Sequence, residues 1–263
     1  MSKLTAVALI ATTSLAACNA TSTSVPTVIG TADVTADSVR AVYNGSSYNF
    51  SEAPEGYATA NGEIIVYESA DVEDAETVFL LNDAGTEEDG ALAVVGFETQ
   101  TATPTFAAAA LVSADSEVPT SGSSTYTGAY FGALILVDAE RGYRVVGGTA
   151  GVASLDANFS TNMVKGRVSD RQFGEFGDPP DPNINMEDLL IKRTKIHSDG
   201  SFEINTTGGE LYETGEPPSV VTHVDGAGAF GGSNGDYAAG VVVLDHAYDT
   251  QTYREFGTLT AER

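Results

Sequence analysis

The chain has 263 residues, and its 37 acidic side chains outnumber its 12 Lys and Arg so far that the formal net charge is −25 at pH 7. A surface of that sign repels nucleic acid and anionic lipid, so we expect neither as a partner. It suits a solvated protein in a salty medium, and it would also attract a cationic partner. Tryptophan is absent, and the 28 glycines are typical of an all-β protein with many turns.

The N-terminus has the layout of a bacterial secretory signal. Lys3 precedes an apolar run that begins at Leu4 and ends in the segment Leu15-Ala16-Ala17-Cys18. Small residues before a cut and a cysteine directly after it resemble the lipobox of bacterial lipoproteins. This resemblance implies that residues 1–17 are a signal peptide and that the sulfur of Cys18 is diacylated.

Cys18 is also the only cysteine, so the chain cannot form an internal disulfide. Lipidation would convert its thiol to a thioether and so remove a reactive group from an oxidising compartment. The alternative is an ordinary signal peptide followed by a stray cysteine. We predict a lipoprotein, because the position, the flanking residues and the uniqueness of Cys18 agree.

Several acyl chains on Cys18 would hold the protein on a bilayer, whereas a single chain binds only marginally. Residues 18–26 then form the lipidated cysteine and a small, polar, flexible tether. Asn19 follows the cysteine; in lipoproteins of Gram-negative bacteria, a residue other than Asp there is associated with the outer membrane. After Cys18 the longest apolar run, Phe106–Val112, is far shorter than the ~20 residues of a spanning helix. We therefore predict a lipid-anchored outer-membrane protein, on the cell surface or the periplasmic face.

Short apolar runs with period-2 alternation, separated by Gly, Asn, Asp and Pro, predict strands along the rest of the chain. Residues 113–124 shift to Ser, Asp, Pro, Thr and Gly, which predicts a domain boundary. A β-rich N-terminal domain would then cover residues 27–118, and a C-terminal domain residues 119–263. The strands predicted in the first half are Val39–Tyr43, Glu63–Tyr67, Thr77–Leu81, Ala91–Glu98 and Pro104–Val112.

The second half predicts a small antiparallel barrel of about eight strands, because closure removes the exposed edges of an open sheet. A hairpin is expected around residues 160–162, and Asp199-Gly200 predicts a second turn. Glycines inside strands, such as Gly128 and Gly240, suit a sheet that bends sharply to close. The predicted strands are Tyr126–Val137, Tyr143–Gly147, Leu155–Phe159, Val164–Val168, Leu189–Ile196, Phe202–Thr206, Val220–Gly231, Tyr237–Leu244 and Phe256–Ala261.

Roughly residues 122–263 resemble the barrel of transferrin-binding protein B-like lipoproteins. The resemblance lies in the order and spacing of short motifs, such as the family's "Val-x-Gly-x-Ile", "Gly-Ser-Phe" and a closing "Phe-Gly" strand. The matching segments are Tyr126–Tyr130, Ala153–Phe159, Val164–Val168, Asp199–Phe202, Gly226–Gly232, Tyr237–Val242 and Phe256–Leu259.

The resemblance implies an all-β lobe, in which a small β-rich handle domain at residues 27–118 precedes an eight-stranded antiparallel β-barrel. It also implies a transferrin-binding protein-like solute-binding protein on the outer membrane. Members of the family capture host proteins such as transferrin, lactoferrin, haemoglobin or complement factor H, or bind haem. A TonB-dependent receptor or a surface-lipoprotein translocator would be a partner in the envelope.

Residues that could carry chemistry are few. None of the three histidines, His197, His223 and His246, has the spacing of a metal site or lies in a nucleophile motif. No carboxylate pair, catalytic triad or phosphate-binding loop stands out. We therefore predict no enzyme activity, no cofactor and no metal, with haem binding through His197 or His223 as an alternative on family grounds.

The longest irregular segment of the second half is Phe173–Asp188. Its aromatic residues and prolines suit a loop that offers apolar contact to a partner. The alternatives are that the segment is a solvated connector or that it binds calcium. Its carboxylates, however, lack the spacing of a calcium loop. Leu211–Ser219 is a second such loop. The candidate binding residues are Phe173, Phe176, Asp178, Asp181 and Met186.

These observations predict a non-enzymatic binding module that is lipid-anchored and captures a protein or an iron- or haem-type ligand. The alternative is a structural envelope lipoprotein without a specific ligand. A carrier of the lipocalin type would need a hollow barrel, which the bulky strand residues disfavour. Those residues are Leu155, Phe159, Phe202 and Phe230.

Overall fold

The computed structural model describes the backbone of residues 32–35, 38–43, 46–59, 62–68, 76–85, 90–98, 106–112, 118–138, 142–175, 179–248 and 250–263. Side chains are described for residues 80, 82–85, 90–97, 110, 118–137, 144–175, 179–248 and 250–263. Cys18, the predicted signal peptide and tether, Phe176 and Asp178 lie outside the described residues. Among the residues described, no helix is long and apolar enough to cross a membrane.

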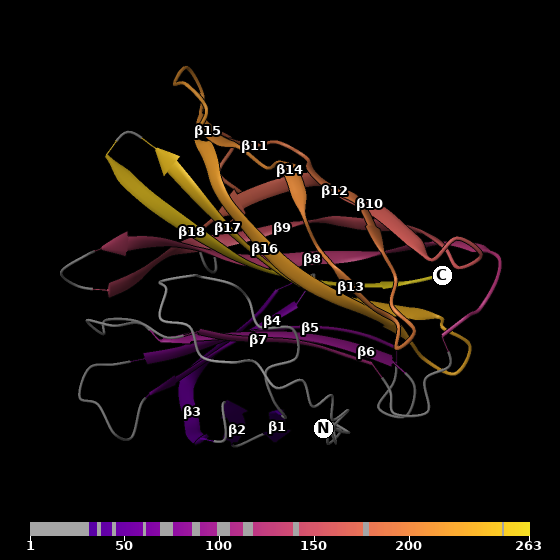
Figure 1. The fold of residues 1–263 in the computed structure, drawn as a ribbon. Helices are drawn as coiled ribbons and strands as arrows, with labels where there is room; N and C mark the ends of the chain where they lie inside the picture. The colour runs from indigo at the N-terminus through magenta and orange to yellow at the C-terminus, as the bar shows by residue number, and fades with distance from the viewer. Residues whose placement is uncertain are drawn as a thin grey trace, which may run out of the picture.

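The first seven strands form one antiparallel sheet in which each strand pairs with the next along the chain (Figure 1). Five of them were predicted, whereas β1 and β3 were not. β3 was not predicted because its polar residues do not alternate with apolar ones. Its pairing with β4 also shifts register between Glu52 and Gly56, around Pro54. The strands are β1 (Ala32–Thr35), β2 (Ser38–Tyr43), β3 (Ser46–Thr59), β4 (Gly62–Glu68), β5 (Glu76–Gly85), β6 (Gly90–Glu98) and β7 (Phe106–Val112).

The second sheet has nine strands in the order β13-β16-β17-β18-β8-β9-β10-β12-β14, and it curls around a single interior (Figure 1). A separate two-stranded ribbon consists of β11 and β15. The strands are β8 (Ser123–Asp138), β9 (Gly142–Asn158), β10 (Met163–Gly174), β11 (Ile184–Met186), β12 (Leu189–Lys195), β13 (Ser201–Glu203), β14 (Thr206–Gly208), β15 (Leu211–Glu213), β16 (Val220–Gly231), β17 (Tyr237–Tyr248) and β18 (Gln251–Glu262).

The two edge strands of this sheet, β13 and β14, are consecutive parts of one segment. β13 pairs with β16, and β14 pairs with β12. Between them, the Ile204 amide donates to the Gly226 carbonyl at 2.8 Å, and the Lys192 amide donates to the Asn205 carbonyl at 2.7 Å. Counted as one strand, the segment joins the two sides of the sheet, which confirms the predicted all-β fold with an eight-stranded antiparallel barrel.

Several local predictions are confirmed and others are corrected. The strands predicted separately at Tyr143–Gly147 and Leu155–Phe159 lie in one continuous strand, β9. β9 and β10 form the expected hairpin, with Asn158 opposite Met163, and Gly200 has the positive φ (83°) of a tight turn. The predicted strand Phe202–Thr206 is one continuous segment, but it changes partner midway from β16 to β12. The predicted irregular segments Phe173–Asp188 and Leu211–Ser219 each contain a strand, since β11 pairs with β15.

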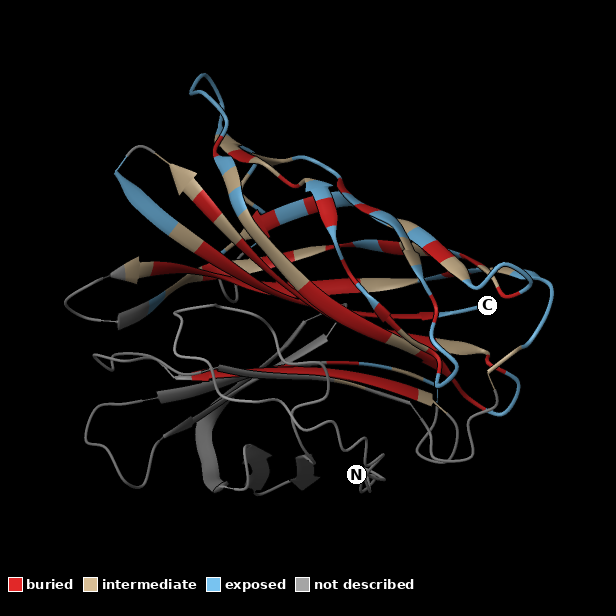
Figure 2. Ribbon diagram, viewed as in Figure 1, coloured by how far each residue is buried: buried red, intermediate tan, exposed pale blue. Residues whose placement is uncertain are grey.

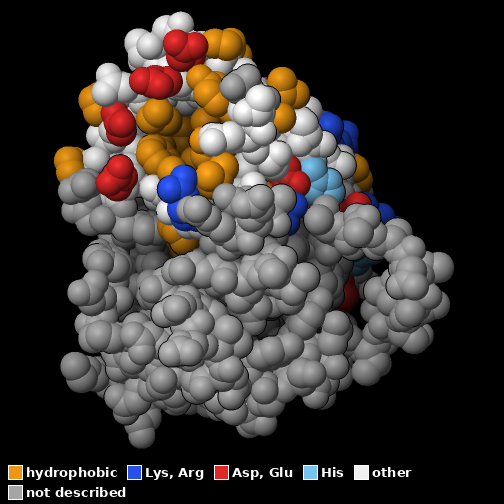
Figure 3. All heavy atoms as spheres, turned by 90° about the vertical axis from the view of Figure 1, so that its left-hand side faces the viewer, with side chains coloured by type: hydrophobic (Ala, Val, Ile, Leu, Met, Phe, Trp, Pro, Cys, Tyr) orange, Lys and Arg blue, Asp and Glu red, His pale blue; other side chains and the backbone are white. Residues whose placement is uncertain are grey.

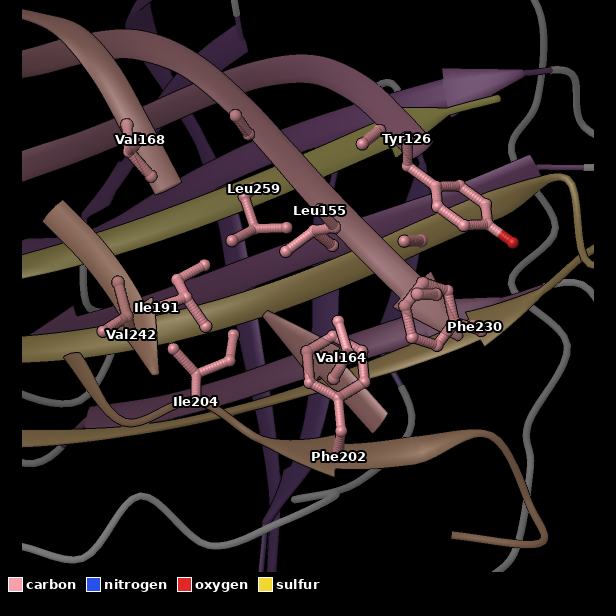
Figure 4. Packing of buried hydrophobic residues seen from close by; sticks show 14 of the residues in the cluster. Tyr126, Leu155, Val164, Val168, Ile191, Phe202, Ile204, Phe230, Val242 and Leu259 are labelled. Carbon is pink, nitrogen blue, oxygen red and sulfur yellow. The ribbon is translucent and has the colours of Figure 1, made fainter. Parts of the chain in front are cut away.

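The barrel interior is filled with side chains. Phe230 lies at the centre of an aromatic cluster near one end of the barrel. The centroid of its ring lies 5.0 Å from that of Tyr126, 5.5 Å from that of Phe159 and 4.9 Å from that of Phe202. Leu155 and its aliphatic neighbours extend the cluster along the axis (Figure 4). Buried residues recur along most of the barrel strands (Figure 2). All four bulky residues expected to fill the barrel are therefore buried.

A second core joins the barrel to the seven-stranded sheet. Outward-facing residues of β8, β17 and β18, such as Phe256, pack against Leu80 of β5 and Phe97 of β6. The Phe97 and Phe256 rings stack with centroids 4.9 Å apart. The amide of Asn82 donates to the Ala129 carbonyl at 3.1 Å, so buried polar groups also cross between the sheets. The outer wall of the barrel on this side is thus covered.

Interior glycines let the chain approach itself where no side chain would fit. A Cβ on Gly128 would collide with the backbone carbonyl of Thr260, and one on Gly257 would collide with the hydroxyl of Tyr130. At Gly257 this space is taken by the Tyr130 ring, which reaches into the barrel toward the polar cluster described below.

Candidate functional site

An apolar patch lies at the end of the barrel where β8 and β10 finish and β9 and β18 begin. We call it the mouth. Its buried base consists of Leu134, Phe173 and Leu211. Partly buried side chains packed on this base are Val146, Ile184, Met186 and Tyr253. Figure 3 shows this face of the molecule, with hydrophobic side chains gathered on it and Asp and Glu side chains along one border.

The β11–β15 ribbon forms one side of the mouth, and its pairing sets Ile184 opposite Glu213 and Met186 opposite Leu211. Hydrogen bonds continue beyond the ladder. The Thr214 amide donates to the Asn183 carbonyl at 2.8 Å, and the Leu211 amide donates to Ser219 Oγ at 3.0 Å. A ribbon this short is marginal alone, so its position depends on the barrel beneath it.

Asp181 shapes the turn that leads into β11. Its Oδ1 accepts from the Asn183 backbone amide at 2.9 Å, and its own amide donates to the Phe173 carbonyl at 2.8 Å. The carboxylate is therefore used locally, in the manner of an Asx turn. It fixes the approach of the chain to the mouth.

A buried polar cluster lies directly below the mouth, centred on the carboxylate of Glu255. Arg171 donates through Nη2 to both oxygens, at 2.7 and 2.5 Å. The Tyr130 hydroxyl donates to Oε1 at 2.6 Å, and the Thr149 hydroxyl donates to the same oxygen at 2.9 Å. His246 Nε2 lies 3.3 Å from Oε2. The Arg171 and Glu255 side chains are both 0% exposed, so water does not compete for these bonds.

Arg171 also connects the cluster to the ribbon. Its Nη1 donates to the Glu187 carbonyl at 2.9 Å and to the Gly209 carbonyl at 3.1 Å. Glu187 directly follows β11, and Gly209 comes two residues before β15. One guanidinium therefore holds the bases of both ribbon strands, and the mouth depends on the orientation of Arg171.

A register shift turns Arg171 inward. β9 and β10 pair regularly as far as Ser169 and resume at Gln172, and between them Asp170 has a positive φ (53°). Before the shift the even-numbered Val164 and Val168 face the interior; after it the odd-numbered Arg171 and Phe173 do. The bulge thus changes which residues of β10 face inward.

The electrostatics of the cluster keep it ionised. Burial alone raises the pKa of Glu255, but the Arg171 charge and the hydrogen bonds from His246 and Arg171 outweigh it, and the pKa of Glu255 falls far below its usual range. Burial, and then the Glu255 charge, raise the pKa of Tyr130 well above its ordinary value, so its phenol remains a donor. Burial lowers the pKa of Arg171, yet Glu255 more than offsets this and the net shift is upward.

Chemically, the cluster supports the fold rather than a reaction. The Glu255 carboxylate has no exposed surface, and its oxygens are occupied by Arg171, Tyr130 and Thr149. His246 Nδ1 and Arg171 Nε are buried without a hydrogen-bond partner. Within the part of the chain that the structure describes, no group of three His, Cys, Asp or Glu side chains could hold a metal ion.

The predicted site residues are distributed unevenly around the mouth. Met186 contributes to its rim, and Asp181 shapes the adjoining turn. Phe173 is only 8% exposed and belongs to the base, beneath the partly buried side chains. The burial follows from the bulge in β10, which a period-2 pattern does not reveal. Phe176 and Asp178 lie outside the described residues.

The histidines are separated. His197 is exposed at the turn after β12, His223 is half-buried in β16, and His246 is buried against Glu255. The cluster could not be predicted from the sequence, because its members come from five strands. The local hint was a pair of charged residues, Arg254 and Glu255, within a strand whose middle is buried.

Comparisons with known proteins add little detail. No protein-family model and no curated protein matches the chain. Among solved structures, the chain is similar to two mutant forms of the vaccine antigen transferrin-binding protein B from Haemophilus parasuis. The first match has a TM-score of 0.40 and 12% identity and covers 88% of this chain and 42% of that one. The second has a TM-score of 0.32 and 11% identity and covers 88% and 60%.

The chain thus spans less than two thirds of the length of either structure. Likenesses this distant carry no argument about function, so the proposals below depend on the residues and the geometry of this chain.

The buried cluster predicts a specific pH dependence. Because the pKa of Glu255 is lower in the folded than in the unfolded chain, the ionised carboxylate stabilises the fold above about pH 4.3, and this contribution is lost as the pH falls further. Glu255→Gln should lower the free energy of unfolding by about 3–5 kcal/mol at pH 7, because Arg171 loses its counter-charge. The difference from the unsubstituted protein should shrink between pH 5 and pH 3 in urea titrations.

Asp156→Asn is the matched control, since Asp156 pairs with Lys165 at 3.8 Å on the surface. Its effect should stay below about 1 kcal/mol at every pH. A difference between Glu255→Gln and the unsubstituted protein that is constant from pH 7 to pH 3 would contradict the assignment.

Proposed function

We propose that the chain is a lipid-anchored, non-enzymatic binding protein that captures a protein or an iron- or haem-type ligand at the mouth of its barrel. The observation that carries the proposal is the mouth itself: four partly buried hydrophobic side chains held over a buried apolar base. Hydrophobic side chains gathered on one face and bordered by polar groups are typical of interaction sites.

The arrangement of the mouth favours recognition by contact. Its base lies on long barrel strands, and the ribbon is tied to the barrel by Arg171. A surface held in this way loses little conformational entropy on binding, which favours affinity. The partly exposed residues combine an aromatic anchor, Tyr253, with the adaptable side chain of Met186.

The charge of the segments that carry the ribbon favours a basic partner. Residues 179–188 and 209–219, which carry the ribbon, contain six Asp and Glu and no Lys or Arg. Acidic residues at the rim of an interface steer an oppositely charged partner and raise the rate of association. The acidic side chains are Asp181, Glu187, Asp188, Glu210, Glu213 and Glu216.

An internal carrier and an enzyme are both less well supported. The interior between the mouth and the opposite end is occupied by the polar cluster and by aromatic side chains such as Phe230. A ligand inside the barrel would have to displace them. The ionised groups of the cluster have no exposed surface at which a substrate could react.

The proposed location depends on the N-terminal motif. Diacylation of Cys18 would attach the protein to the outer membrane, and residues 19–26 would give it reach from the bilayer. In this proposal residues 27–118 form the handle domain and residues 119–263 the barrel domain. A TonB-dependent receptor or a surface-lipoprotein translocator would act beside it in the envelope.

The competing function is a structural envelope lipoprotein with no specific ligand. Site-specific crosslinking separates the two. A photo-crosslinking amino acid replaces Met186 in cells of the producing organism, which are grown with the natural source of the ligand. Irradiation of these cells should give a discrete crosslinked species. Mass spectrometry of that species then identifies the partner.

The control places the same amino acid at Val152, which is 41% exposed on the outer wall of β9. Position 152 should give no discrete species. If positions 186 and 152 yield the same products, or neither yields any, the mouth is not a binding site and the structural alternative is favoured.

Lipidation predicts a clear effect of Cys18→Ser. Cells fed an alkyne-labelled fatty acid should label the unsubstituted protein and not the variant, because the thiol is the only acceptor. The variant should leave the membrane fraction, since residues 19–26 alone give no apolar anchor. Equal labelling and equal membrane association of the two proteins would overturn the proposed anchor.

A further inference from the structure

Five exposed cations gather on two neighbouring strands of this strongly acidic protein. They lie on β10 and β12, which pair with each other on the barrel wall. Lys165 and Lys192 have only long polar contacts, at 3.8 Å to Asp156 and 3.5 Å to Asn205 Oδ1. Among the described residues, the other three form no ion pair. The five residues are Lys165, Arg167, Lys192, Arg193 and Lys195.

A second bulge concentrates these charges. The pairing of β10 with β12 shifts register between Val164 and Gly166, opposite residues 191–194 of β12. Lys192 and Arg193 are consecutive, yet both are exposed. In a regular strand one of them would face the interior, so the bulge presents an additional cation to solvent.

A groove opens beside these cations, with a volume of about 480 Å³. This volume falls in the range of small-molecule sites. Its lining combines two cations with hydroxyl, amide, carboxylate and apolar groups. The lining residues are Ser123, Ser124, Thr125, Asp156, Ala157, Asn158, Met163, Val164, Lys165 and Arg193.

We propose that this groove binds a small saccharide that carries a single phosphate or sulfate ester. Arg193 can meet the ester oxygens with its planar fork, and Lys165 adds a second positive charge. The hydroxyl of Ser123 and the amide nitrogen of Asn158, whose oxygen accepts from the Thr161 amide at 2.9 Å, suit sugar hydroxyls. Met163 offers an apolar surface to a sugar ring.

The carboxylate of Asp156 contributes to the selectivity of the groove. It accepts from Thr125 Oγ1 at 2.9 Å and lies 3.8 Å from Lys165 Nζ. It can accept from a sugar hydroxyl, while it repels a second anionic group placed over it. Together with the net charge of −25, this favours one ester on a neutral sugar over an extended polyanion or an anionic membrane.

The groove is independent of the mouth. It is lined by the first residues of β8 and β10 and the last residues of β9, whereas the mouth is formed where β8 and β10 end and β9 begins. The two sites lie at opposite ends of the barrel strands, so both can be occupied in one molecule. Failure of either proposal leaves the other intact.

Calorimetric titration of the full chain with glucose 6-phosphate tests the inference. Binding is expected with a Kd on the order of 0.1–1 mM, given the size of the ligand. Glucose and inorganic phosphate should each bind at least about 10-fold more weakly, because each provides only part of the recognised group. The combined substitution Lys165→Gln and Arg193→Gln should weaken binding of glucose 6-phosphate at least about 10-fold.

Arg144→Gln is the control, because Arg144 is an exposed arginine at the other end of β9. It should bind glucose 6-phosphate as the unsubstituted protein does. The inference is overturned if glucose 6-phosphate does not bind at 10 mM, if inorganic phosphate or glucose binds as tightly, or if the control and the double variant bind equally.

Discussion

The ion pair between Arg171 and Glu255 is the interaction on which the arrangement of this barrel depends. Removing two charges from water is costly. In this interior the cost is offset by hydrogen bonds from Arg171 Nη2 to both carboxylate oxygens and by the hydroxyl donors of Tyr130 and Thr149. The Arg171 guanidinium also lies 5.8 Å from the centre of the Tyr130 ring. Its remaining donors hold the two backbone carbonyls from which the β11–β15 ribbon extends. A buried charge pair is weak evidence for net stability, but it specifies one geometry.

That geometry divides the barrel into layers along its axis. An aromatic and aliphatic core around Phe230 fills one end, the polar cluster lies in the middle, and the mouth forms the other end. Because the interior is filled, recognition is left to the surfaces. The seven-stranded sheet covers the wall formed by β8, β17 and β18, while β10 and β12 carry the exposed cations. The mouth and the groove are thus what the packing leaves exposed.

The sequence predicted most of the strands, because period-2 alternation and turn residues such as Asp199-Gly200 act locally. It did not predict the ribbon, since β11 and β15 have three residues each and pair across a long separation. The polar cluster was also missed, because Arg171 and Glu255 are 84 residues apart. The loop containing Met186 was selected for its composition. The burial of Phe173 could not be predicted in the same way, because the bulge at Asp170 reverses the alternation of β10.

Amide hydrogen exchange of Arg171→Lys against the unsubstituted protein tests most directly whether Arg171 holds the mouth in place. Lysine keeps the charge opposite Glu255 but has one nitrogen, so it lacks the separate Nη1 that donates to both ribbon carbonyls. The account predicts that amides of β11 and β15 exchange at least about 10-fold faster in the variant, while those of β17 and β18 keep their protection. Unchanged exchange in the ribbon, or equal acceleration throughout the barrel, would contradict it.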